Sequence, residues 1–183
     1  KYTREDYMER IHAIRQILPG CNISTDLIAG FCDETEEDHK QTLSLMEWAG
    51  FDAAYMFKYS ERPQTLAADT LNDNVPEKIK DRRLKEIIDL QQKLSLNSNQ
   101  KDIGKIFEIL IEGKSKRSDN QYFGRNSQNK VAVFTKTASR PKEYVNVKIT
   151  GTTSATLLGE ITPPYRDWLK SQKSPLRRKD AKN

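Results

Sequence analysis

The sequence is short of the residues that several classes of protein require. Only two of its 183 residues are cysteine and only two are histidine. Two cysteines are too few for a disulfide scaffold, and the spacing of Cys21 and Cys32 fits no zinc motif. No Cys-x-x-x-Cys-x-x-Cys triplet occurs, and nothing supports a Ser-His-Asp, Cys-His or metallohydrolase centre. We therefore expect neither metal ligands nor catalytic residues in this chain.

Long apolar runs are also missing. No stretch approaches the ~20 apolar residues that a membrane-spanning helix needs, and the first residues lack the apolar segment of a signal peptide. Charged residues make up 31% of the chain. We therefore expect a cytoplasmic protein without a membrane partner. Because the sequence does not begin with methionine, we also expect it to be a piece of a longer protein.

Charge is distributed unevenly along the chain. Residues 1–96 carry 13 basic and 18 acidic residues, whereas residues 97–162 carry 11 and 6, and residues 163–183 carry 7 and 2. An acidic first half is thus followed by a basic second half, which is typical of a nucleic-acid-binding module. A solvated basic surface without a partner would give the same distribution.

The first half predicts helices alternating with strands. Apolar spacing predicts a helix over residues 3–18, with Thr3 and Asp6 as a capping box, and strands over residues 21–29 and 52–59. Between the strands, Thr35 is an expected N-cap and Gly50 an expected helix end. Pro76 opens a long helix that the polar residues 97–100 are expected to break. This order is that of a repeating α/β layer.

The pattern changes after residue 100. Five short β-prone runs cover residues 106–112, 122–124, 131–134, 144–150 and 156–161, separated by polar or glycine-containing turns. Five short strands in about 60 residues predict a small closed barrel of the OB type. We expect one domain over residues 1–96, the barrel over residues 97–162, and a basic, mobile tail over residues 163–183.

Asp26, Gly30 and Phe57 form the candidate ligand site of the first half. A carboxylate at the end of a strand can accept hydrogen bonds from ribose hydroxyls, although a buried aspartate satisfied by backbone N–H groups is an alternative. Gly30 permits a sharp turn and a close approach of a ligand to the backbone. Phe57 could stack on an adenine or pack in the core.

The candidate nucleic-acid-binding residues lie in the predicted barrel. One basic group falls in a turn between strands and the other on the next hairpin, with Tyr122 or Phe123 available for stacking. Phosphate contacts by these groups would give salt-dependent affinity, whereas the alternative is a rim that only keeps the protein in solution. The candidates are Lys114, Lys116, Arg117, Arg125, Asn129 and Lys130.

Several motifs together resemble a known family. The run STDLIAGF at residues 24–31, followed by ETEED at residues 34–38, is similar to the STDIIVGFPGETEEDF hallmark of the radical-SAM methylthiotransferases. FDAAYMFKYS at residues 51–60 matches the next segment of that family. Further matches lie in the following helix and in the C-terminal TRAM domain of the family, at residues 74–77, 90–91, 112–113, 115–117, 124–125 and 129–131.

The resemblance implies a fold and an activity. It implies an α/β plus all-β chain, namely the C-terminal part of a radical-SAM (β/α) partial barrel followed by a small OB-like TRAM β-barrel. The complete enzyme would use S-adenosylmethionine (SAM) and two [4Fe–4S] clusters, whose cysteine ligands this chain lacks, so the chain alone is expected to be inactive. Asp26 would hold the SAM ribose, and Gly30 and Phe57 would shape the adenine pocket.

The segment FKYSERP and the basic barrel loop resemble the MiaB type, which methylthiolates isopentenyl-adenosine beside the tRNA anticodon. The partners implied are therefore the tRNA anticodon arm and the missing N-terminal part of the same enzyme. A related enzyme acting on threonylcarbamoyl-adenosine, or a stand-alone RNA-binding protein with a degenerate α/β half, remain alternatives. The sequence departs from the family pattern where Pro-Gly is replaced by Cys32-Asp33, and where the glycine of Pro-Gly-Thr is replaced by Gln64.

Overall fold

The computed structural model describes residues 2–136 and 138–162, which form two compact units. Within the described residues, the first unit comprises residues 2–102 together with Thr152–Thr156, and the second comprises the rest of residues 103–151 and residues 157–162. The mobile tail expected over residues 163–183 lies outside the described residues. Within the described part, none of the helices combines the length and the apolar character needed to span a membrane.

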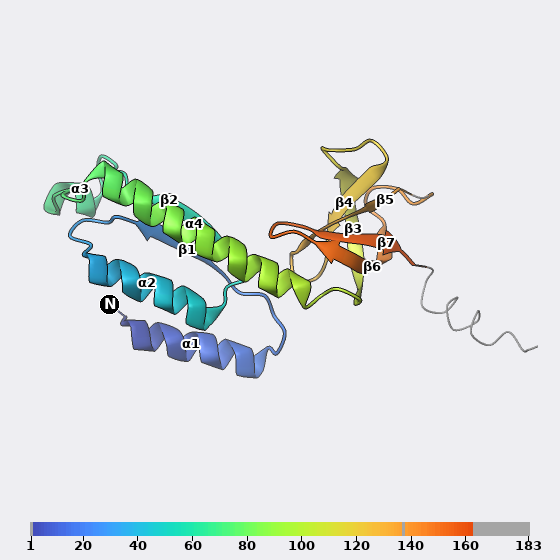
Figure 1. The fold of residues 1–183 in the computed structure, drawn as a ribbon, viewed down its shortest axis with the longest axis horizontal. Helices are drawn as coiled ribbons and strands as arrows, with labels where there is room; N and C mark the ends of the chain where they lie inside the picture. Colours follow the sequence, from blue (N-terminus) through green and yellow to red (C-terminus); the bar gives the residue numbers. More distant parts are fainter. Residues whose placement is uncertain (1, 137, 163–183) are drawn as a thin grey trace, which may run out of the picture. The chain divides into compact units, whose positions relative to one another are not determined.

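The first unit alternates helices and strands, as the sequence predicts. Thr3 and Thr35 cap the first two helices with complete capping boxes, and Gly50 ends the second in the left-handed conformation, with a φ of 54°. A short helix that follows Thr65 was not predicted. The elements, shown in Figure 1, are α1 (Arg4–Ile17), β1 (Ser24–Ala29), α2 (Glu36–Ala49), β2 (Ala53–Lys58), α3 (Leu66–Thr70) and α4 (Glu77–Gln100).

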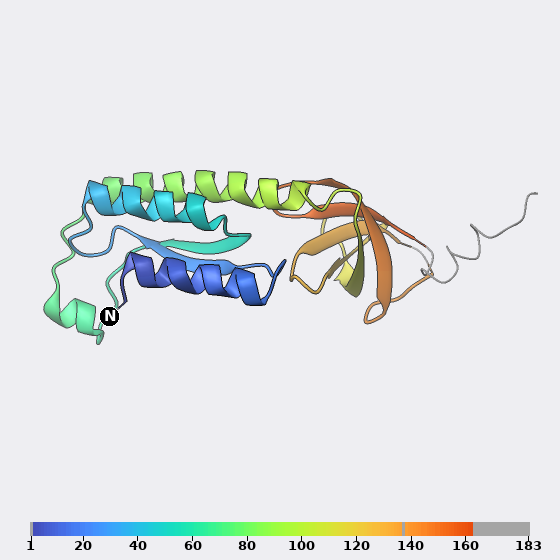
Figure 2. The same ribbon diagram turned by 90° about the horizontal axis from the view of Figure 1, so that it is seen from below.

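Strands β1 and β2 are parallel neighbours, in a register that pairs Ser24 with Ala53 and Ala29 with Lys58. Parallel neighbours require a crossover, which α2 provides. α4 runs along β2 in both views (Figures 1 and 2). The core of the unit combines all three long helices with the inward face of the sheet, and its buried members are Ile11, Ala29, Met46, Ala49, Phe51 and Ile87.

The expected break of α4 at residues 97–100 is wrong, because the helix continues to Gln100. Its polar side chains have partners in the first unit. Ser98 donates to the Asp52 carboxylate, and Asn99 Nδ2 donates to the carbonyls of Thr153 and Ser154 at 3.0 and 3.3 Å. Because these tertiary bonds satisfy polar side chains that would otherwise favour a turn, local propensity does not decide where the helix ends.

The second unit is a closed five-stranded barrel, which confirms the small OB-like fold. Its strands are ordered β3-β4-β5-β7-β6. β3 is antiparallel to β4 and to β6, β4 is antiparallel to β5, and β5 is parallel to β7. Gly124 lies where β4 crosses β3 closely, since a Cβ there would lie 2.0 Å from the Leu110 carbonyl oxygen. The strands are β3 (Ile106–Lys114), β4 (Gln121–Arg125), β5 (Val131–Thr135), β6 (Tyr144–Thr152) and β7 (Leu157–Ile161).

Candidate functional site

The two-stranded sheet leaves one of its faces open. Leu27 and Met56 point into the core, whereas the alternate residues Ile28, Tyr55 and Phe57 are 58, 63 and 55% exposed. Parallel strands are normally covered on both faces. Within the described residues this apolar face has no cover, so it is a surface on which a ligand or further chain can pack.

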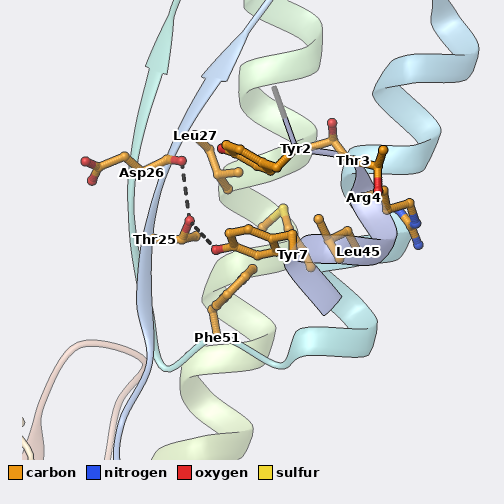
Figure 3. Close-up of a pocket in the computed structure, with 11 residues that line it drawn as sticks. Tyr2, Thr3, Arg4, Tyr7, Thr25, Asp26, Leu27, Leu45 and Phe51 are labelled. Carbon is orange, nitrogen blue, oxygen red and sulfur yellow. Dashed lines mark hydrogen bonds between the residues drawn. The ribbon is translucent and has the colours of Figure 1, made fainter. Parts of the chain in front are cut away.

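Asp26 lies on the open face. Its residue is exposed, and in the described part of the chain its carboxylate has neither a hydrogen bond nor an ion pair. In Figure 3 the side chain points away from Tyr7 and Leu45, which lie on the helix-covered side. The alternative of a buried aspartate satisfied by backbone N–H groups is therefore wrong, and the carboxylate is available to a ligand.

A pocket of about 490 Å³ opens at the ends of both strands, and we call it the strand-end pocket. Asp26 supplies a carboxylate, and Ile28 and Phe57 supply apolar surface, on the same side of the sheet. Its volume lies in the range of small-molecule sites, roughly 300–1,000 Å³. The lining residues are Asp26, Ile28, Phe57, Lys58, Tyr59, Ser60, Arg62, Thr65 and Ala67.

Gly30 does not line the strand-end pocket. It is buried, with a φ of 73°, and Lys80 packs against it. The Glu34 carboxylate accepts the N–H groups of Gly30 and of Phe31, the latter at 3.1 Å. The loop after β1 is thus fixed by its own glutamate, and Gly30 lies outside the pocket lining.

His39 is a structural histidine that supports this loop. Its side chain is 1% exposed, Nε2 lies 2.7 Å from Glu86 Oε2, and Nδ1 lies 3.9 Å from Glu34 Oε1. The hydrogen bond from His39 and the neighbouring Arg82 hold the pKa of Glu86 below its ordinary value. Arg83, also buried, donates to the Glu34 carbonyl at 2.9 Å. These groups tie the loop to α4.

A second pocket, of about 250 Å³, lies on the other side of β1 and is drawn in Figure 3. The Tyr7 hydroxyl is 3.2 Å from Thr25 Oγ1, and the Tyr2 and Tyr7 rings stack at 6.3 Å. Arg4 donates to the Gln41 carbonyl. Asp26 also lines this pocket, but its side chain points away from Tyr7 and Leu45, so the carboxylate faces the open side of the sheet instead.

The barrel separates the six candidate RNA-binding residues into two groups. Lys114, Lys116 and Arg117 lie at the end of β3 and in the turn that follows, next to the start of β4. The hairpin with the other three lies at the far end of β4. The two ends of β4 are four residue steps apart, which corresponds to about 13 Å along the strand. The two groups are therefore not one cluster.

Arg125 is already engaged within its hairpin. Its Nε lies 3.2 Å from Glu112 Oε1, and Nη1 donates to the Asn129 carbonyl and Oδ1 at 3.2 and 3.1 Å. Asn129 has a φ of 62°, a conformation that asparagine tolerates. The Lys130 N–H donates to Asn126 Oδ1 at 2.9 Å. These contacts give the hairpin a defined shape, whereas Lys116 and Arg117 are exposed.

Sequence reasoning missed Lys136, which belongs with the first basic group. Its Nζ lies 5.2 Å from the Tyr122 ring centroid, and its N–H donates to the Asn120 carbonyl at 2.9 Å. Tyr122 also packs against the barrel core, so only part of its ring is accessible. The β-prone run of β5 places Lys136 just after the strand. Its position beside the β3–β4 turn depends on the pairing of strands in the barrel, which the sequence does not show.

Comparison with known proteins shows what the chain is similar to. The TRAM domain family matches residues 100–162, which confirms the predicted barrel type. The chain is 58% identical over 160 residues to the tRNA-2-methylthio-N(6)-dimethylallyladenosine synthase of Bacteroides fragilis, and 61% identical over 160 residues to that of Parabacteroides distasonis. The matched residues are homologous to these synthases.

The resemblance to the methylthiotransferases is thereby confirmed over the matched residues. Identity remains 53% over 158 residues for the synthase of the same name from Chloroherpeton thalassium. The matches to the Bacteroides and Parabacteroides proteins cover 87% of this chain but only 35% of each relative. The chain thus spans about a third of the length of the curated relatives it matches.

Proposed function

We propose that the chain is the C-terminal part of a tRNA methylthiotransferase that acts on isopentenyl-adenosine beside the anticodon. The observation that carries the proposal is the 58% identity to a synthase whose name states this product, since dimethylallyl and isopentenyl denote the same substituent. The matched relatives carry no threonylcarbamoyl product in their names. The complete enzyme would act in the cytoplasm, where tRNA is found.

The first unit would be the end of a radical-SAM partial barrel. Its order of strands and helices and its parallel pairing suit a (β/α) barrel. The bare sheet face, with Ile28, Tyr55 and Phe57, suits a barrel interior that the preceding part of the enzyme would complete. We retain the proposed division into residues 1–96 and 97–162, although the bounds of the compact units differ from it, because α4 runs to Gln100 and Thr152–Thr156 belong to the first unit.

The residues of the strand-end pocket fit the nucleoside part of SAM. Asp26 presents an unpaired carboxylate that can accept hydrogen bonds from both ribose hydroxyls, and Phe57 and Ile28 present apolar surface to the adenine. Gly30 keeps the loop behind them compact. SAM and the two [4Fe–4S] clusters would supply the chemistry that replaces a C–H bond by C–S–CH3.

The cluster ligands would come from the preceding part of the enzyme. Each cluster of this family takes three cysteines, and this chain has only Cys21 and Cys32. The two cysteines flank β1 at opposite ends, and Cys32 is buried. What this chain contributes is therefore the nucleoside wall and the tRNA-binding barrel.

The barrel would hold the anticodon arm by phosphate contacts. We propose Lys114, Lys116 and Arg117 as one set of contacts, because they are exposed at the end of β3 and in the turn that follows, and Lys136 lies beside them. The second set comprises Arg125, Asn129 and Lys130 on the β4–β5 hairpin. Phosphate contacts position the RNA without reading its sequence, so the base would be chosen by the catalytic half.

The function is tested with the full-length protein, reconstituted anaerobically with iron and sulfide. It is incubated with SAM and with tRNA that carries isopentenyl-adenosine, and the digested nucleosides are analysed by mass spectrometry. We expect a methylthio product from this tRNA and none from tRNA lacking the isopentenyl group. Conversion of threonylcarbamoyl-adenosine instead would contradict the proposal. The 183-residue chain treated identically is expected to bind no iron and give no product.

A further inference from the structure

One lysine contacts the ends of both strands that form the pocket. Lys80 lies at the start of α4 and is 3% exposed. Its stem covers Gly30, since a Cβ on that glycine would lie 2.4 Å from Lys80 Cγ and 3.1 Å from its Cβ. Gly30 directly follows β1, so the lysine stem packs against the turn that ends this strand.

The ammonium group of the same lysine reaches the end of β2. Nζ lies 2.6 Å from Asp73 Oδ2 and 3.5 Å from the Tyr59 carbonyl oxygen, and it lies 5.3 Å from the centroid of the Tyr59 ring. Tyr59 lines the strand-end pocket, and its N–H donates to the Ala29 carbonyl at 2.8 Å. Lys80 therefore contacts both the glycine that follows β1 and a pocket-lining residue that follows β2.

Stability alone does not explain a buried lysine here. Replacing a buried ion pair by apolar side chains is often neutral or stabilising, because desolvation offsets the attraction of the charges. A long apolar stem with a cationic head can, however, fill the space above Gly30 and bind a carbonyl several ångströms further on. The position thus demands both properties of lysine, which suggests a geometric role.

We propose that Lys80 is a positioning residue for the nucleoside pocket. It fixes the Gly30 turn and the Tyr59 carbonyl, so that Asp26 and Phe57 are held at the spacing required by one ligand. Lys80 touches neither the reacting atoms nor the pocket interior, since it is absent from the lining. The ligand assignment rests on the proposed function, but the effect on the backbone does not.

The backbone effect is tested in the 183-residue chain by amide hydrogen exchange. Lys80→Met keeps the apolar stem and removes the ammonium group. We expect the amides of Gly30, Phe31 and Tyr59 to exchange about tenfold faster, as local opening becomes easier, while the Met46 amide in α2 changes less. Lys78→Met is the matched control, since Lys78 is an exposed lysine of the same helix. Unchanged exchange in Lys80→Met would overturn the proposal.

A second variant covers the case in which Lys80→Met does not fold. Asp73→Asn leaves the stem on Gly30 but removes the partner of the ammonium group, and the Asp73 side chain is 27% exposed, so the change is tolerable. It is expected to speed exchange at Tyr59 more than at Gly30. If the Tyr59 and Gly30 amides of this variant exchange at the same rates as in the wild type, the proposal is likewise overturned.

The ligand effect is tested in the full-length protein by equilibrium binding of SAM and of tRNA. Lys80→Met is expected to weaken SAM binding about tenfold, because the pocket backbone loses one charge-assisted hydrogen bond that orders it. Binding of tRNA is expected to stay within twofold. General destabilisation would weaken both. Equal SAM affinity of variant and wild type would refute the positioning role. A wild type that does not bind SAM would refute the proposed function instead, and the exchange data alone would then decide the role of Lys80.

Discussion

Asp33 and Asn74 are joined by two reciprocal hydrogen bonds. Asn74 Oδ1 accepts the Asp33 N–H at 3.0 Å, and Asn74 Nδ2 donates to Asp33 Oδ1 at 2.6 Å. Asp33 has a φ of 64°, in the region that favours glycine, and the methylthiotransferase pattern has glycine at this position. Gln64, the other replaced glycine, has a φ of 66°. Both departures therefore keep the backbone shape that glycine would adopt.

The two positions should respond differently when glycine is restored. Gln64→Gly is expected to raise the free energy of unfolding by roughly 0.5–1 kcal/mol, because relief of a strained φ outweighs the greater freedom of glycine in the unfolded chain. Asp33→Gly should be neutral or destabilising, since it also breaks the bond from Asn74. Chemical denaturation of both variants measures the difference.

Asn74→Ala provides the control for this prediction. In its background the Asp33 side chain has lost its partner, so Asp33→Gly should now stabilise the protein, as Gln64→Gly does in the wild type. If the effects of Asp33→Gly and Asn74→Ala on the free energy of unfolding are additive, the hydrogen bonds between these residues do not compensate the strain of the positive φ at Asp33.

The sequence predicts the local elements of this fold well, and its tertiary relationships poorly. Caps and turn glycines act within a few residues, so the Thr35 cap and the Gly50 end were predictable. The end of α4 was not, because Asn99 is satisfied by carbonyls more than 50 residues away. The burial of Lys80 was not predicted either, because it depends on contacts with Gly30 and Tyr59 far away in the sequence.

The candidate site shows the same limit. The spacing of Asp26 and Phe57 placed both on strands, and parallel pairing then brings them to one face. Whether Asp26 is buried or open could not be predicted, because it depends on which face the helices cover. The basic residues were found by composition, but their division between two ends of β4 follows from barrel topology.

Acid should weaken the attachment of α2 to α4 through Glu36. Its carboxylate pairs with Arg82 and Arg83 at 2.6 and 3.2 Å, and the Arg82 hydrogen bond chiefly lowers the pKa of Glu36 from 4.5 to about 2. The folded pKa lies below the unfolded one, so the contribution to stability is present above pH 4.5 and is lost as pH falls toward 2. Thermal unfolding from pH 2 to 7 measures it.

The comparison that isolates Glu36 is the Glu36→Gln variant. Its melting temperature should lie below that of the wild type at pH 6, and the two curves should converge near pH 2. Glu37→Gln serves as the control, because in the described part of the chain Glu37 forms no ion pair. A constant gap between wild type and Glu36→Gln at all pH values would contradict the linkage.

The first basic group of the barrel should contribute measurably to tRNA binding by this chain. Neutralising Lys116 and Arg117 together to glutamine is expected to lower the magnitude of the salt slope, log Kobs against log salt, by about 1.4–1.8, since two phosphate contacts are lost. Lys148→Gln, an exposed change on β6, should leave the slope almost unchanged. Filter binding over a range of salt concentrations decides between a binding surface and a solubilising rim.

Arg125 should behave differently from Lys116, because it holds its own hairpin. Arg125→Gln removes the ion pair with Glu112 and the bonds to Asn129. We expect faster amide exchange in the β4–β5 hairpin together with a change in salt slope below 1. A slope change as large as that for Lys116 and Arg117, without any change in exchange, would show that Arg125 binds phosphate directly.

The Asp26 carboxylate should matter for ligand binding and not for folding. It is exposed and unpaired within the described residues, so Asp26→Asn should leave the melting temperature of the chain unchanged. In the full-length protein the same variant should bind SAM roughly tenfold to a hundredfold more weakly, since hydrogen bonds to a charged acceptor contribute about 1.5–3 kcal/mol. Asp69→Asn, an exposed change on α3, is the matched control. Because Asp26 faces the open side of the sheet, a loss of stability of the full-length protein without a loss of affinity would mean that the preceding chain, and not a nucleoside, covers this face.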